Sequence, residues 1–134
     1  MPRLFLSGYC NLYNAVKANP KLAESLGSPD SLKSRINELA ELLISLQSKG
    51  YSGACWGYNF DWQARRLFLF PKFTPTVVAS NFCATALMEA YEITREKRFL
   101  EIALSAAHFV INDLHRTEYK DGFLFSYSPL QGND

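Results

Sequence analysis

Hydrophobic residues recur at helical spacing in four stretches of the chain. In the clearest stretch, residues 28–49, they follow one another at intervals of four, three, four and three residues: Leu32, Ile36, Leu39, Leu43 and Leu46. This spacing predicts a helix with one apolar face. Ser28 and Pro29 predict its start. Serine can cap a helix, and proline is tolerated at the first helical position because the N–H that it lacks would have no helical partner there. Lys49 and Gly50 predict its end.

A first helix is predicted over about residues 4–18. Its apolar positions also keep helical spacing: Phe5, Tyr9, Leu12 and Val16. We expect this helix to end before Asn19 and Pro20, since the residue preceding a proline disfavours the helical conformation.

The last two stretches differ from each other in polarity. Thr74 and Pro75 predict the start of a third helix, which is apolar nearly all round from residue 77 to residue 91. Such a helix has to be enclosed by other protein. The fourth, about 96–116, carries a narrow polar stripe of Glu101, Ser105, His108 and Asn112. We therefore expect the third helix to be internal and the fourth to cover it.

A weak internal repeat links the two halves of the chain. Gly53–Tyr58 and Gly122–Tyr127 are both glycine-led aromatic segments, and Trp56 and Phe125 correspond at an offset of 69 residues. A helical hairpin precedes each segment. We therefore predict one all-α domain over residues 1–134, with two hairpins at about 4–49 and 75–116 and aromatic loops at 50–73 and 117–134. A tetratricopeptide hairpin takes about 34 residues, so two would fit into each unit, but each unit has one hairpin. Tetratricopeptide-type repeats are therefore disfavoured.

Three segments resemble a known fold family, the α/α toroids. They are Gly-Ala-Cys-Trp-Gly-Tyr-Asn-Phe-Asp-Trp-Gln at 53–63, Phe-Thr-Pro-Thr-Val-Val at 73–78 and Ala-Tyr-Glu-Ile-Thr at 90–94. The toroids include six-hairpin glycosidases and terpenoid-cyclase-like barrels. Over about residues 32–129 the chain resembles uncharacterised toroid proteins of polysaccharide biosynthesis. This resemblance implies alternating inner and outer helices and a ligand site where the loops meet at one end.

Members of that family continue into further hairpins after the position of Pro129. The resemblance therefore implies an incomplete ring of about four main helices. We expect a large apolar surface on the third helix or its neighbours, covered by a second copy of the chain or by a compact, non-toroidal packing.

Composition and charge exclude several classes of protein. The 134 residues are 48% hydrophobic, and 14 Lys and Arg against 13 Asp and Glu give a net charge of +1. This balance gives no electrostatic basis for binding nucleic acid or an anionic membrane surface. The apolar start of the chain is interrupted by Gly8, Asn11 and Asn14, so neither a signal peptide nor a membrane span fits it.

The three cysteines, Cys10, Cys55 and Cys83, are odd in number and widely spaced. This pattern favours reduced, buried thiols in a cytoplasmic protein over a disulfide framework. The sequence contains no CxxC or HxxxH pair, and we expect neither a metal site nor a cofactor.

Residues 56–66 form the best candidate binding segment, because apolar rings alternate there with polar side chains. Its aromatic rings could stack on sugars, its amides could bond hydroxyl groups, and its basic pair at 65–66 could hold a carboxylate or phosphate. The predicted substrate-binding residues are Trp56, Tyr58, Asn59, Trp62, Gln63 and Arg65. In the structural alternative, this loop folds its rings onto helix ends, and Asp61 caps the loop or pairs with Arg65.

Glycoside hydrolysis would need two carboxyl groups beside the scissile bond. Asp61 is one candidate, and Asp121 lies at the matching approach to the second aromatic loop. Glu89 and Glu92 are further options. The histidines fit surface positions, and the sequence leaves open whether the protein is an enzyme.

Two classes of function remain. One is a saccharide-processing or saccharide-binding protein that acts through residues 53–66. The other is a non-catalytic helical interaction module that associates with itself. An isoprenoid-cyclase-like enzyme ranks last, because the chain has no Asp-rich diphosphate motif.

Overall fold

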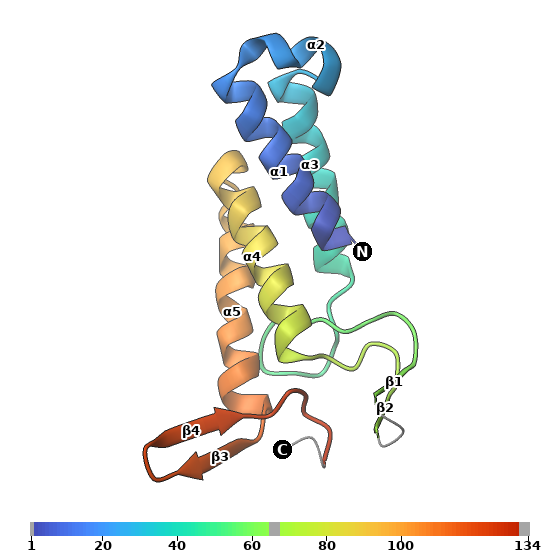
Figure 1. Cartoon of the computed structure of the whole chain (residues 1–134), viewed down its shortest axis with the longest axis vertical. Helices are drawn as coiled ribbons and strands as arrows, with labels where there is room; N and C mark the ends of the chain where they lie inside the picture. The colour runs from blue at the N-terminus through green and yellow to red at the C-terminus, as the bar shows by residue number, and fades with distance from the viewer. Residues whose placement is uncertain (1, 65–67, 132–134) are drawn as a thin grey trace.

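The computed structural model describes residues 2–64 and 68–131. Its helical elements are α1 (Pro2–Ala18), a 3-10 turn η1 (Pro20–Leu22), α2 (Ala23–Leu26), α3 (Pro29–Ser45), α4 (Val77–Thr94) and α5 (Lys97–Asp113). Its strands are β1 (Trp62–Ala64), β2 (Phe68–Phe70), β3 (Arg116–Tyr119) and β4 (Gly122–Phe125). The helical class is confirmed (Figure 1). The all-α prediction misses the two small antiparallel sheets, β1–β2 and β3–β4.

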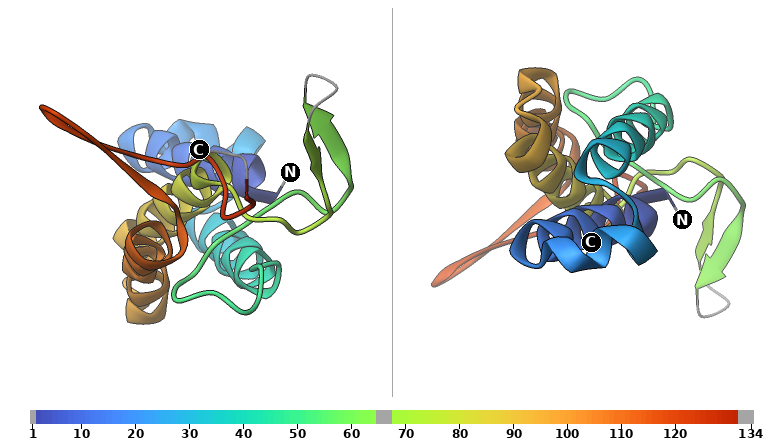
Figure 2. Two further views of the ribbon diagram at one scale, coloured as in Figure 1. Left: turned by 90° about the horizontal axis from the view of Figure 1, so that it is seen from below. Right: turned by 90° about the horizontal axis from the view of Figure 1, so that it is seen from above.

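The four long helices are arranged as two hairpins that lie against each other. Helices α1 and α3 form one, and α4 and α5 form the other (Figure 1). Helix α4 contacts all three other long helices, as its apolar sequence predicts. Seen along the bundle, the two β-hairpins project from different sides (Figure 2). That these two hairpins are part of an incomplete α/α toroid remains a prediction.

The two proline-containing helix starts behave differently. At α3 the prediction is confirmed: Pro29 is the first helical residue, and Ser28 Oγ accepts the N–H of Ser31 at 3.2 Å. At α4 the predicted cap is wrong by two residues. Thr76 is the cap, and its Oγ1 accepts the N–H of Ala79 at 3.1 Å. Pro75 precedes the helix because it forms a β-bridge with Gly57.

Two predicted helix ends lie too far along the chain. Helix α3 ends at Ser45 rather than at Lys49, and the chain then turns so that the buried Ser48 hydroxyl donates to the carbonyl oxygen of Phe73 at 2.7 Å. Helix α5 ends at Asp113 rather than at residue 116, because the chain from residue 116 onward pairs in the β3–β4 hairpin.

The main core lies between the four long helices. Its fully buried side chains come from each of them: Leu6, Ile36, Ala40, Leu87, Ala90 and Phe99. Trp56 belongs to the same cluster, so the loop after α3 contributes to the core. A second, smaller cluster joins Cys55 to Phe109 and Leu114.

Gly53 lets this loop lie directly against α5. A Cβ atom at residue 53 would overlap the carbonyl oxygen of Ser105 and lie 2.9 Å from the amide nitrogen of Phe109. The N–H of the next residue, Ala54, donates to Ser105 Oγ at 3.2 Å. The backbone contact that places the aromatic segment therefore requires glycine.

We predict that Gly53→Ala lowers the free energy of unfolding by roughly 1–3 kcal/mol, since the loop has to move away from α5. Gly8→Ala is the matched control, because a Cβ at residue 8 of α1 would meet nothing within 4 Å. That control should be neutral or stabilising, by up to about 1 kcal/mol. Urea unfolding followed by circular dichroism measures both. Equal stability of the two variants would contradict the close contact.

Candidate functional site

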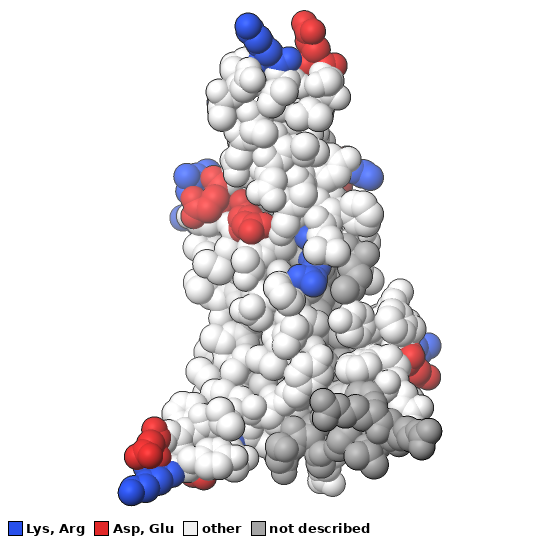
Figure 3. Space-filling model, viewed as in Figure 1, with Lys and Arg blue, Asp and Glu red and all other residues white. Residues whose placement is uncertain are grey.

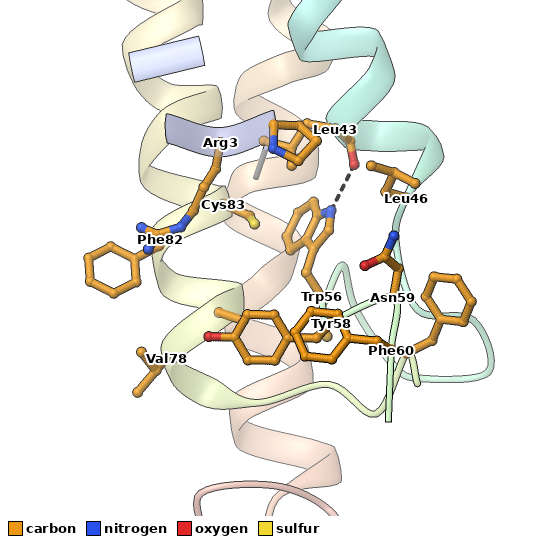
Figure 4. Close-up of a pocket in the computed structure, with 14 residues that line it drawn as sticks. Arg3, Leu43, Leu46, Trp56, Tyr58, Asn59, Phe60, Val78, Phe82 and Cys83 are labelled. Carbon is orange, nitrogen blue, oxygen red and sulfur yellow. Dashed lines mark hydrogen bonds between the residues drawn. The ribbon is translucent and has the colours of Figure 1, made fainter. Parts of the chain in front are cut away.

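A cavity of about 410 Å³ lies where the first aromatic segment meets the helices (Figure 4). The start of α1, the end of α3, residues 56–60 and the first turns of α4 all contribute to it. This volume falls within the range of about 300–1,000 Å³ that is usual for small-molecule sites. The lining residues are mostly apolar: Pro2, Arg3, Leu43, Leu46, Trp56, Gly57, Tyr58, Asn59, Phe60, Phe73, Val78, Ala79, Phe82 and Cys83.

Trp56 forms a fixed wall of this cavity. It is only 2% exposed, and its indole N–H donates to the carbonyl oxygen of Leu43 at 2.8 Å (Figure 4). Its backbone N–H donates to Ser80 Oγ at 3.0 Å, and its carbonyl oxygen accepts the N–H of Thr76 at 3.1 Å. The ring is therefore fixed by its own hydrogen bond and by an anchored backbone, and it shapes the cavity rather than offering a free face.

The rings of Tyr58 and Phe60 provide the more accessible aromatic surface. They stack with centroids 5.3 Å apart and planes at 25°, and Phe60 is 55% exposed. Asn59, between them in sequence, is exposed and also lines the cavity. Three of the predicted binding residues, including Trp56, are thus brought together here.

The other predicted binding residues do not line this cavity. Trp62 lies on β1 and stacks on Phe70 at 4.3 Å with nearly parallel planes, so one of its faces is covered. It also meets Tyr58 edge-on at 5.9 Å. Gln63 is exposed on the same strand. Arg65 lies outside the described residues.

The two predicted catalytic carboxylates are not brought together. Asp61 Oδ1 accepts the backbone N–H of Lys72 at 2.7 Å, which closes the base of the β1–β2 hairpin. Asp121 lies in the turn of the β3–β4 hairpin, which projects from another side of the molecule (Figure 2). None of the described residues lining the cavity carries a carboxyl group.

The other two carboxylates considered on α4 also lie outside the cavity lining. Glu92 is exposed and pairs with Arg95 at 3.1 Å. Glu89 is half-buried, and among the described residues its Oε2 has no hydrogen-bond partner.

Sequence analysis missed Arg3, which lines the cavity. Its guanidinium carbon lies 3.8 Å from the ring centroid of Phe82 on α4. This is a close cation–π contact. The aromatic segment begins at Gly53, fifty positions after Arg3, and the packing of α1 against α4 brings Arg3 to the site.

The three cysteines are buried free thiols. Burial raises the pKa of Cys10, Cys55 and Cys83 to about 12, with nearby carboxylates adding to the effect at Cys10 and Cys55. At Cys83, which lines the cavity, Arg3 opposes the rise in pKa. At neutral pH these groups are protonated and hence poor nucleophiles.

Residues 2–64 and 68–131 hold neither a metal-binding cluster nor a membrane-spanning helix. No group of three or more His, Cys, Asp or Glu side chains there is arranged to hold a metal ion. No helix in those ranges is long and apolar enough to cross a bilayer.

Comparison with known proteins assigns the chain to no family. No protein-family model, no curated protein and no solved structure matches it.

The buried thiols predict a loss of stability at alkaline pH. An unfolded chain releases its thiol protons near pH 9, whereas the native state retains them to about pH 12. The native state then binds more protons, so the free energy of unfolding falls as the pH rises from 9 to 12. Urea unfolding at a series of pH values measures the slope.

Cys55→Ala removes one of the three contributions and should make this slope shallower. The comparison is between slopes, because the substitution also leaves a small void that lowers stability at every pH. An unchanged slope would show that Cys55 does not titrate differently in the two states.

Proposed function

We propose that the protein binds a saccharide in this cavity and does not cleave it. The observation that carries the proposal is the stacked pair Tyr58–Phe60 at the side of a cavity of about 410 Å³. The C–H face of a pyranose ring is apolar and packs well on an aromatic ring. The stacked pair is oriented by Trp62, which meets Tyr58 edge-on, and is therefore a preformed surface.

Polar groups at the cavity suit hydroxyl recognition. The Asn59 amide can both donate and accept hydrogen bonds, the Tyr58 hydroxyl can do the same, and the Arg3 guanidinium donates. A few polar groups among apolar walls are typical of small-ligand sites. The resemblance to toroid proteins of polysaccharide biosynthesis points to the same class of ligand.

Binding without hydrolysis is the better-supported form of this proposal. Acid–base cleavage of a glycosidic bond usually needs two carboxyl groups about 5–9.5 Å apart. Asp61 is the carboxylate nearest in sequence to residues 56–60 of the cavity, and it accepts a hydrogen bond from the backbone of Lys72. The described cavity lining contains no carboxylate.

Isothermal titration against a panel of neutral and anionic methyl glycosides tests the proposal. We expect at least one to bind, and Tyr58→Leu to weaken that binding by about 1–2 kcal/mol because the stacking ring is lost. Tyr119→Leu is the matched control, since Tyr119 is an exposed tyrosine at the far end of the β3–β4 hairpin. Failure of every glycoside to bind at millimolar concentration would reject the proposal.

The surface area of the chain favours a second candidate function, self-association. The chain exposes 8549 Å², whereas a compact monomer of 15.2 kDa exposes about 7,100 Å². Part of this excess of about 1,400 Å² belongs to the two β-hairpins that project from the bundle (Figure 2). Part of this exposed surface is apolar, because Val78, Phe82 and Met88 of α4 are each between 44% and 46% exposed.

Part of the face that contains α4 is also poor in charge. Figure 3 shows acidic and basic side chains on the upper half of this face, whereas the lower half of α4 lies in a region free of Lys, Arg, Asp and Glu side chains. A net charge of +1 would oppose association of two copies only weakly. We therefore propose that a second copy covers α4 around Met88, which lies outside the cavity that Val78 and Phe82 line.

Sedimentation equilibrium tests self-association. We expect a concentration-dependent dimer that Met88→Glu weakens by about tenfold or more, because a charge would be buried in an apolar contact. Met88 does not line the cavity. Leu42→Glu, at a 45% exposed leucine of α3, is the control and should leave the dimer intact. A wild-type monomer at high micromolar concentration would contradict the proposal.

A further inference from the structure

We infer that the cavity selects saccharides that carry a negative charge, and that Arg3 binds this charge. The inference rests on the proposed function, since it names the kind of saccharide that the same cavity takes.

Arg3 dominates the electrostatics of the cavity. Among the described residues that line it, Arg3 is the one with a charged side chain. The ion pairs formed by the described residues involve Arg35, Arg95, Arg98 and Arg116, and none includes Arg3. Its charge is therefore not balanced by a carboxylate within the described site, and an anionic ligand would balance it.

The guanidinium of Arg3 is held in position by a ring. It lies 3.8 Å from the centroid of Phe82, and Figure 4 shows its side chain extending from the start of α1 toward that ring. Stacking uses one face of the planar group and leaves N–H donors at its edge. Those donors can bind an oxyanion with two parallel hydrogen bonds, as arginine does with carboxylates and phosphates.

The apolar surroundings strengthen this interaction. Val78, Leu43 and Phe82 line the same cavity, so a ligand in it displaces water from around Arg3. Charge-assisted hydrogen bonds are stronger where water is excluded. A carboxylate on the sugar, as in a uronic acid, and a phosphate on the sugar share this chemistry.

Paired ligands provide the test. Methyl β-D-glucuronide and methyl β-D-glucoside differ only in the carboxylate or hydroxymethyl group at C6, and the methyl ester of the glucuronide keeps its size without its charge. By isothermal titration we expect the glucuronide to bind about tenfold or more tightly than either neutral compound. This preference should shrink as salt is raised. Glucose 6-phosphate, measured alongside, distinguishes phosphate from carboxylate as the preferred oxyanion.

Variants of Arg3 assign the preference to this residue. Arg3→Gln should bring the glucuronide and glucoside affinities to within about twofold, while Arg3→Lys should retain part of the preference because it keeps the charge but not the planar fork. Arg116→Gln is the matched control. Arg116 also stacks on a ring, that of Phe123 at 4.4 Å, but it lies on the β3–β4 hairpin outside the cavity.

The outcomes separate the inference from the proposed function. Equal binding of glucoside and glucuronide by the wild-type protein would overturn the inference and leave saccharide binding in place. A preference that survives in Arg3→Gln would also overturn it. Binding of none of the glycosides would reject both. Circular dichroism of each variant confirms that α1 is still folded.

Discussion

The positions of the two aromatic segments, 53–58 and 122–127, depend on the beginning of α4. A helix start leaves four backbone N–H groups without helical partners. Here Thr76 N–H donates to the carbonyl oxygen of Trp56 at 3.1 Å, and Val77 N–H donates to that of Tyr127 at 2.9 Å. Ala79 N–H is bonded by the Thr76 side chain. The helix start is thus satisfied largely by two segments that are distant in sequence, and in return it fixes their positions.

These two segments are the ones that form the internal repeat of the sequence. Each presents a carbonyl oxygen to one of two consecutive residues at the start of α4, Thr76 and Val77. The two carbonyl groups are not equivalent in the repeat, because Tyr127 corresponds to Tyr58 rather than to Trp56. The repeat does not extend to the strands. The β1–β2 hairpin follows its aromatic segment, whereas the β3–β4 hairpin contains the start of the second one.

The local sequence is sufficient to predict the long helices, but it is insufficient to predict the structure of the segments that connect them. The spacing of apolar residues predicted four long helices, and Ser28 was identified as a cap because its neighbours agree with that role. Thr74 and Thr76 have the same side chain, so either could cap the helix by type. The β-bridge between Gly57 and Pro75, which is a tertiary contact, keeps Pro75 outside the helix and leaves Thr76 as the cap. The three-residue strands carry too little periodicity to be distinguished from an aromatic loop.

The same division applies to the candidate site. Trp56, Tyr58 and Asn59 are contiguous and could be found together from the sequence. The aromatic type of Trp62 predicts that it joins them, but pairing of β1 with β2 places its ring against Phe70. Arg3 could not be found, since nothing near it in sequence is related to the aromatic segment.

The chain contains two tryptophans, and both lie within residues 56–62. Trp56 is enclosed in the core, and Trp62 is stacked on a phenylalanine that meets Tyr127 edge-on at 6.0 Å. Their surroundings therefore differ, with one indole bonded to a carbonyl oxygen and the other packed between rings. The tryptophan fluorescence of the protein consequently originates from the neighbourhood of the cavity. It provides a built-in optical reporter of that region, without any label.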